Sequence, residues 1–299
     1  MTPVGWLTAA VRLARPAQWP ILTAQFALAV LLAGPGPESG FAAWAHGLAP
    51  ASLLGGWAAW VVLLNGGTLA FNSAYDRDTG PVAYLAAPPV PPPGLAPFAL
   101  AAMAAGVVLG ARAVGPFFAA VTAGCVLLSV AYSHPAVRLK ARPGWDLAVN
   151  MVGYGAGTTA AGLATGGGGP TGPGWGFVAG FGLLFGSFYP LTQIYQAADD
   201  SARGDRTLAT ALGTRRALAL ALGLGLAAAG VLGGALVGAE RTAAWWVPAA
   251  ALGLWCLHVA WWRARAARWN AARHERGMYT ALGLWALIDV ALAWAWLAG

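Results

Sequence analysis

Long apolar runs, each close to twenty residues, follow one another along almost the whole chain and limit it to very few folds. A helix of about 20 mostly apolar residues is long enough to cross a membrane. Charged residues make up only 9% of the chain, whereas a soluble domain carries about 25%. We therefore predict an all-α, polytopic membrane helix bundle that forms one domain over residues 1–299. About nine transmembrane helices are expected, near residues 18–35, 51–73, 95–113, 116–133, 147–165, 175–195, 216–238, 243–262 and 278–298.

Most basic residues fall in the same alternate set of loops. With a cytoplasmic N-terminus, 15 of the 17 lie on the cytoplasmic side, where positive loops are favoured. The net charge of +7 is then concentrated on one membrane face, which predicts contact with anionic membrane lipid and no nucleic acid partner. We expect an integral protein of a prokaryotic cell membrane. The residues on that face are Arg12, Arg15, Arg77, Arg138, Lys140, Arg142, Arg203, Arg206, Arg215, Arg216, Arg263, Arg265, Arg268, Arg273 and Arg276.

Two short segments hold five of the ten acidic residues. The first, residues 71–78, reads FNSAYDRD, and the second, residues 196–206, reads QAADDSARGDR. Residues four apart lie on one face of a helix. Asn72 and Asp76 should therefore point the same way at the end of the second predicted span, as should Gln196 and Asp200 after the sixth. The shared order of span, amide, carboxylate and arginine-containing loop resembles an internal duplication.

The predicted topology places these two acidic loops on the same face as the basic loop that carries Arg138 and Lys140. Magnesium binds carboxylate oxygens together with substrate phosphates, and carboxylates alone would repel a diphosphate. Basic side chains would neutralise the remaining phosphate oxygens. We therefore predict a central cavity, open to the cytoplasmic side, that holds a lipid diphosphate and Mg²⁺. The candidate metal ligands are Asp76, Asp78, Asp199, Asp200 and Asp205, and the candidate phosphate ligands are Arg138, Lys140, Arg203 and Arg206.

The fifth predicted span contains two further features. Asp146 begins it and is expected to act as a negative charge at the helix N-terminus. Glycines in membrane helices allow close helix packing, and Gly153, Gly155 and Gly157 are expected to have this role.

Together, these segments resemble the UbiA superfamily of intramembrane prenyltransferases, which have nine spans and two aspartate-rich motifs, written NxxxDxxxD and DxxxD. Residues 72–78 resemble the first motif and residues 199–208 resemble the second. The order of the matches agrees with the family over most of the chain. The remaining matches are Arg15-Pro16, Tyr132-Ser133, Arg138-Leu139-Lys140 and Leu212-Gly213.

The resemblance implies Mg²⁺-dependent transfer of an isoprenyl group from a polyprenyl diphosphate to a lipophilic, often aromatic acceptor. It implies catalytic roles for Asp76, Asp200, Tyr132 and Lys140. Aromatic rings would stabilise an allylic cation, and apolar walls would exclude water; the candidate rings are Tyr132, Tyr154, Phe188, Tyr189 and Tyr195. The implied substrate-binding residues are Asn72, Arg77, Arg138, Lys140, Gln196, Arg203, Arg206 and Asn150, the last of them facing the acceptor.

The chain departs from the family pattern at three places. Gly80 stands four residues after Asp76, so that Asp78 is the second acid of the first motif. Gln196 replaces the first acid of the second motif, where Asp199 and Asp205 would supply the charge. Residues 86–93, AAPPVPPP, replace the usual Arg-Pro segment. These departures leave the metal geometry and the substrate class open.

Two alternative functions follow from these features. A family member can cyclise a prenyl diphosphate without an external acceptor, and the departures keep that reading open. A transporter would carry ionisable residues deep in several spans, but only Asp289 and His258 lie there, and we expect them to pair with each other or with backbone. The acids at one face therefore favour an enzyme. The acceptor and the prenyl length are not determined by the sequence.

Overall fold

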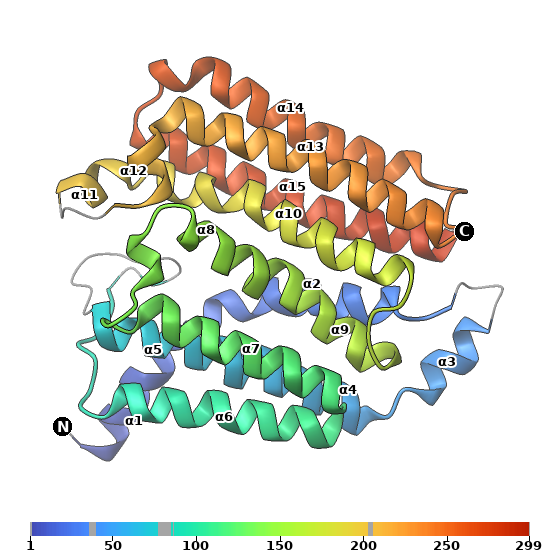
Figure 1. Ribbon diagram of the computed structural model, residues 1–299, viewed down its shortest axis with the longest axis horizontal. Helices are drawn as coiled ribbons and strands as arrows, with labels where there is room; N and C mark the ends of the chain where they lie inside the picture. The colour runs from blue at the N-terminus through green and yellow to red at the C-terminus, as the bar shows by residue number, and fades with distance from the viewer. Residues whose placement is uncertain (1, 36–39, 77–84, 86, 203–205, 299) are drawn as a thin grey trace. The chain divides into compact units, whose positions relative to one another are not determined.

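The computed structural model describes residues 2–35, 40–76, 85, 87–202 and 206–298, without the side chains of Ala198, Asp199 and Ala202. All regular elements in these ranges are helices (Figure 1), as the apolar runs predict. The helices form two compact units. Unit 1 comprises Met1–Ala33, His46–Arg138 and Ala160–Gly169; unit 2 comprises Gly34–Ala45, Leu139–Thr159 and Pro170–Gly299. The single domain expected for residues 1–299 stays a prediction.

A long continuous helix forms the centre of unit 1. It begins at a proline, whose missing N–H is not needed in a first turn, and runs through α4 (Pro50–Trp57), the π-helical η3 (Ala58–Asn65) and α5 (Gly66–Asp76). α6 packs against all three segments, and α7 and α1 pack against α5. The other elements that lie wholly or mostly in this unit are α1 (Pro3–Leu13), η1 (Pro16–Gln18), α2 (Trp19–Leu32), α6 (Leu95–Ala113), α7 (Pro116–Ser133) and α9 (Thr158–Gly167).

In unit 2, α10 (Pro173–Ile194) packs against α13 (Thr214–Gly238), α15 (Ala271–Ala298) and the π-helical η5 (Met151–Gly157). Figure 1 shows α10, α13, α14 and α15 running side by side. A buried chain of hydrogen bonds joins three of them: Trp255 Nε1 donates to Ser187 Oγ (2.9 Å), which donates to the Ala221 carbonyl oxygen (2.7 Å). The remaining elements are η4 (Leu139–Ala141), α8 (Trp145–Asn150), α11 (Ala197–Ala202), α12 (Leu208–Leu212), α14 (Trp246–Arg265) and η6 (Ala266–Arg268), while α3 (Phe41–Gly47) crosses the boundary between the units.

Within the described residues, six helices are long and apolar enough to cross a membrane. They are Pro50–Asp76, Leu95–Ala113, Pro116–Ser133, Pro173–Ile194, Thr214–Gly238 and Ala271–Ala298. Each matches one of the predicted spans, and the chain is an integral membrane protein. The three other predicted spans correspond to α2, to the continuous α8–η5–α9, and to α14. The predicted total of nine is therefore unconfirmed.

Candidate functional site

The first acidic segment lies at the end of a helix, because α5 continues through Asn72 to Asp76. The predicted four-residue spacing is therefore helical, and both side chains are half-buried. Asn72 Oδ1 accepts a hydrogen bond of 3.1 Å from Ser133 Oγ at the end of α7. One turn earlier, Thr68 and Ser129 share a hydrogen bond of 2.8 Å. The two bonds tie α5 to α7, so the Tyr132-Ser133 segment lies beside the first motif.

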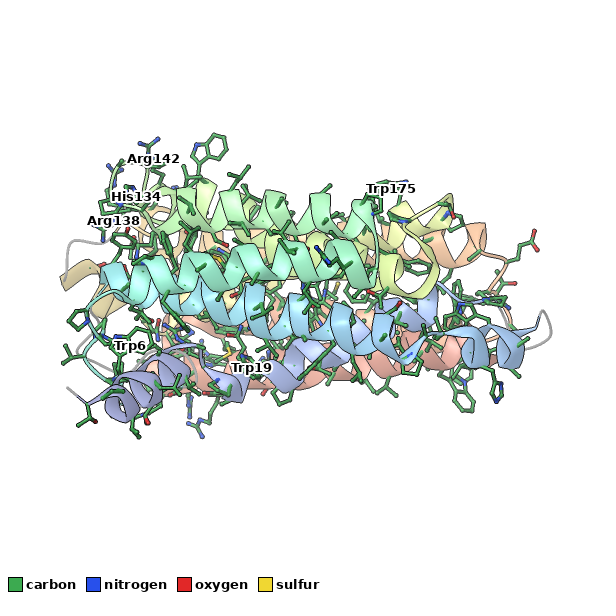
Figure 2. All side chains as sticks on the ribbon, turned by 90° about the horizontal axis from the view of Figure 1, so that it is seen from below. Trp6, Trp19, His134, Arg138, Arg142 and Trp175 are labelled. Carbon is green, nitrogen blue, oxygen red and sulfur yellow. The ribbon has the colours of Figure 1, made fainter. Side chains whose placement is uncertain are left out.

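The segment after α7 lies close to the same end of α5. The His134 ring packs edge-on against Tyr75, with the ring centroids 5.4 Å apart. Arg138 is exposed, and its φ of 47° lies in the left-handed region. Figure 2 shows His134 and Arg138 at the same end of unit 1 as Trp6. Unit 1 thus gathers the described part of the first motif and one predicted phosphate ligand at one end, whereas Arg77 and Asp78 lie outside the described residues.

The second acidic segment follows α10 in unit 2. The Asp200 amide donates to the Gln196 carbonyl oxygen (2.9 Å), so these residues also have helical spacing. Asp200 is 6% exposed. The side-chain amide of Gln196 donates to the Tyr195 hydroxyl (3.1 Å), which gives Gln196 a partner inside the protein. Arg206 is exposed. The Asp199 side chain and the whole of Arg203 and Asp205 lie outside the described residues.

Asp146 has a larger role than the local helix-end charge that its position predicts. It is fully buried, and Oδ1 accepts hydrogen bonds from the backbone amides of Gly144 and Leu147, both at 2.8 Å. These two bonds agree with the predicted helix-end role. Oδ2 accepts from Gln193 Nε2 (3.0 Å) and from the Leu208 amide (3.2 Å). Sequence reasoning missed these two partners, because 47 and 62 residues separate them from Asp146.

Asn65 is a second residue that sequence reasoning missed. It is 4% exposed, and within the described residues neither atom of its side-chain amide has a hydrogen-bond partner. It ends the π-helical η3, seven residues before Asn72, and π-helical segments are frequent at functional sites. An unpaired amide is costly in a membrane interior. The only feature of the sequence that could have identified Asn65 is that it is a single amide within an apolar run.

The remaining predicted binding residues of unit 2 lie on separate elements. Lys140 is half-buried on η4. Asn150 is buried at the end of α8, where its amide donates to the Asp146 carbonyl oxygen (2.8 Å). This bond holds the side chain against its own helix, and the predicted contact of Asn150 with an acceptor stays untested.

An aromatic cluster centred on Phe185 lies in unit 2. Its ring is 5.2 Å from Tyr154, 6.2 Å from Phe188 and 6.5 Å from Tyr189, measured between ring centroids. Trp285 of α15 lies 5.9 Å from the Phe185 ring. Three of the five predicted aromatic residues therefore gather around a phenylalanine that the sequence did not single out.

Only some of the predicted metal ligands lie within the described residues. Among the described residues, no group of three or more His, Cys, Asp or Glu side chains could hold a metal ion. Of the five candidates, only the Asp76 and Asp200 side chains belong to that set. The Mg²⁺ site and its convergence from two motifs therefore stay predictions.

The two ionisable residues expected deep in the spans are not equivalent. His258 Nε2 lies 2.9 Å from the Gly277 carbonyl oxygen, so this residue has the predicted backbone partner. Asp289 is 9% exposed, and within the described part of the chain its Oδ1 has no hydrogen-bond partner.

Comparisons with known proteins identify relatives of this fold. Residues 27–283 match the sequence model of the UbiA prenyltransferase family. A UbiA homologue from Archaeoglobus fulgidus bound to GPP and Mg²⁺ superposes with a TM-score of 0.64 at 19% identity, over 94% of this chain and 99% of that one. A UbiA homologue from Aeropyrum pernix K1 gives 0.59 at 18% identity, over 92% and 95%.

A third structure, of digeranylgeranylglyceryl phosphate synthase, has a TM-score of 0.70 at 12% identity and covers 99% of this chain and 100% of that one. The comparison with curated proteins finds no match. The structural likenesses extend over nearly the whole length of each chain and show a common fold.

Proposed function

The chain belongs to the UbiA prenyltransferase family, and we propose that it transfers an isoprenyl group from a polyprenyl diphosphate to a lipophilic, aromatic acceptor within the membrane. The family match over residues 27–283 is the main observation that supports this proposal. Two neighbours of the same fold support it, because one is bound to GPP and Mg²⁺ and another is named as a prenyl-lipid synthase. The proposal includes a single nine-span domain whose cavity opens to the cytoplasm.

We assign the Mg²⁺ to the carboxylates of the two motifs: Asp76 and Asp200, with Asp78, Asp199 and Asp205 as further ligands. The donor set fits, because Mg²⁺ prefers oxygen ligands and commonly uses one or two carboxylates together with substrate phosphates. When bound, the ion supplies charge neutralisation and Lewis acidity at the leaving diphosphate. Asn72 and Gln196 lie one helical turn before Asp76 and Asp200 and would support these carboxylates.

The other residues would bind the substrate and protect the reacting carbon. The basic side chains would orient the phosphate oxygens through charge-assisted hydrogen bonds; they are Arg77, Arg138, Lys140, Arg203 and Arg206. As the allylic C–O bond breaks, positive charge develops on carbon, which aromatic faces attract. Tyr132 and the cluster around Phe185 would have this role, and the apolar helices would exclude water. The acceptor carbon forms the new C–C bond and loses a proton.

Turnover of labelled prenyl diphosphates by the purified protein tests this function. We expect Mg²⁺-dependent release of diphosphate and a prenylated product when aromatic acceptors are supplied. EDTA should stop the reaction, and readdition of Mg²⁺ should restore it. Diphosphate release with a cyclic hydrocarbon and no need for an acceptor would favour the cyclase. No turnover of any prenyl diphosphate, together with solute flux in proteoliposomes, would favour a transporter.

Cysteine labelling tests the proposed orientation. Ala136 and Thr242 are exposed, and the two native cysteines, Cys125 and Cys256, are buried and would be replaced by alanine. A membrane-impermeant maleimide should label Ala136→Cys only in inverted vesicles and Thr242→Cys only in intact spheroplasts, because the positive-inside arrangement puts residue 136 in the cytoplasm. The reverse labelling pattern would rule out a cytoplasmic site.

A further inference from the structure

We propose that Asp146 and Gln193 form a clamp that positions Asp200 for metal binding; this inference rests on the proposed function. Gln193 lies in the last turn of α10, and Leu208 and Ala209 open α12. The second motif lies between these two points, and Asp200 is part of it. Asp146 is therefore a positioning residue, because its full burial keeps it away from substrate.

The clamp consists of directional contacts that use both oxygens of one carboxylate. All four contacts of Asp146 come from N–H groups, which matches a carboxylate, since an ionised carboxyl group only accepts hydrogen bonds. Oδ1 accepts its two hydrogen bonds at the start of α8, whereas Oδ2 accepts hydrogen bonds from Gln193 and Leu208. One side chain thus joins three elements that are far apart in the sequence.

Gln193 completes the clamp with its other amide atom. Its Oε1 accepts a hydrogen bond of 3.2 Å from the Ala209 amide, and the residue is 8% exposed. The amides of Leu208 and Ala209 belong to the first turn of α12, where a helix leaves its N–H groups without partners of its own. Asp146 and Gln193 accept from these two amides, so the start of α12 is fixed to the end of α10.

The consequence for Asp200 follows from chain closure. A segment whose two ends are held together has far fewer conformations than one with a free end, so the clamp restricts where Asp200 can lie. The same carboxylate anchors the Gly144 amide, three residues after η4, which carries Lys140. Within unit 2 the clamp therefore restrains a predicted metal ligand and a predicted phosphate ligand together.

Amide hydrogen exchange and Mg²⁺ titration test the clamp in the full-length protein. In Asp146→Asn, a side-chain NH₂ group replaces one of the two accepting oxygens. This NH₂ group cannot accept a hydrogen bond, so two N–H groups would lose their acceptor. We expect exchange in residues 206–213 to rise at least about tenfold, and the Mg²⁺ concentration for half-maximal activity to rise about 10- to 100-fold, as for other groups that support metal ligands. Loss of folded protein alone would lower the maximal rate and leave this Mg²⁺ concentration unchanged.

Two further variants make the outcome decisive. Gln193→Met keeps the volume but removes the contacts to Asp146 and Ala209, and it should give smaller changes of the same sign. Glu275→Gln removes an exposed carboxylate charge from α15 of unit 2, outside the clamp, and should alter neither measurement. Unchanged exchange in Asp146→Asn would overturn the clamp, and faster exchange with unchanged Mg²⁺ dependence would overturn its positioning role. Exchange can be measured without turnover, so failure of the proposed function would be seen separately.

Discussion

Replacing Asp76 or Asp200 with asparagine is expected to reduce kcat/KM for a prenyl diphosphate by about 10³-fold or more. Asparagine keeps the shape of the side chain but removes the charge that would hold Mg²⁺. Metal-based stabilisation of a leaving group amounts to several kcal/mol. A change of about 1.4 kcal/mol in the activation free energy corresponds to a tenfold change in rate. Steady-state turnover at saturating Mg²⁺ measures the loss, and size-exclusion chromatography in detergent checks that each variant remains folded.

Glu275→Gln is the matched control for this pair. Glu275 is an exposed carboxylate on α15 outside both motifs, so the same loss of one negative charge should leave turnover unchanged. Activity close to that of the unmodified protein in either aspartate variant would refute the metal assignment of that residue. Loss of activity in all three variants would point to a general effect of charge instead.

Gly155→Ala is expected to destabilise the helix packing of unit 2 by about 1–3 kcal/mol, the usual cost of inserting atoms into a packed interior. A Cβ at this position would lie 2.5 Å from the Phe181 carbonyl oxygen and 2.7 Å from Gly182 Cα. Both are backbone atoms of α10, so relief requires η5 and α10 to move apart. Thermal unfolding in detergent should show a lower Tm and a smaller monodisperse fraction.

Gly153→Ala isolates the contribution of that contact. Gly153 lies on the same η5 segment, and a Cβ there would meet nothing within 4 Å. The close-packing role that the sequence predicted for Gly153 is therefore wrong. Alanine favours a helix over glycine by about 1 kcal/mol, and this benefit applies to both variants. We therefore expect Gly153→Ala to unfold at the same temperature as the unmodified protein or above it. Equal Tm values for the two variants would contradict the close approach of η5 to α10.

The sequence allowed much of the fold to be predicted, because membrane-spanning helices leave a local pattern. Each helix satisfies its own backbone hydrogen bonds, so an apolar run of the right length is enough to indicate a span. Six predicted spans are matched in this way. The run at residues 147–165 is continuous but divided between α8, η5 and α9, and its π-helical section has no signature in the order of apolar residues.

The candidate site could be predicted only in part. Four-residue spacing placed Asn72 with Asp76 and Gln196 with Asp200, because both pairs lie within single helical turns. The same reasoning could not find the bond from Ser133 to Asn72, since two different helices supply its partners. Nor could it find Phe185, whose position at the centre of the aromatic cluster depends on how α10 faces η5 and α15.

By itself, the sequence determined that this is a helical membrane protein of the UbiA prenyltransferase family with two acidic motifs, because hydropathy and motif spacing are local properties of the chain. Only the tertiary structure decided which polar groups form hydrogen bonds with the segments around those motifs. It turned Asp146 from a helix-end charge into the link between Gln193 and Leu208, and it distinguished Gly155 from Gly153. The physical reason is that a hydrogen bond or a close contact across helices depends on which faces pack together, and residues distant in the sequence set those faces.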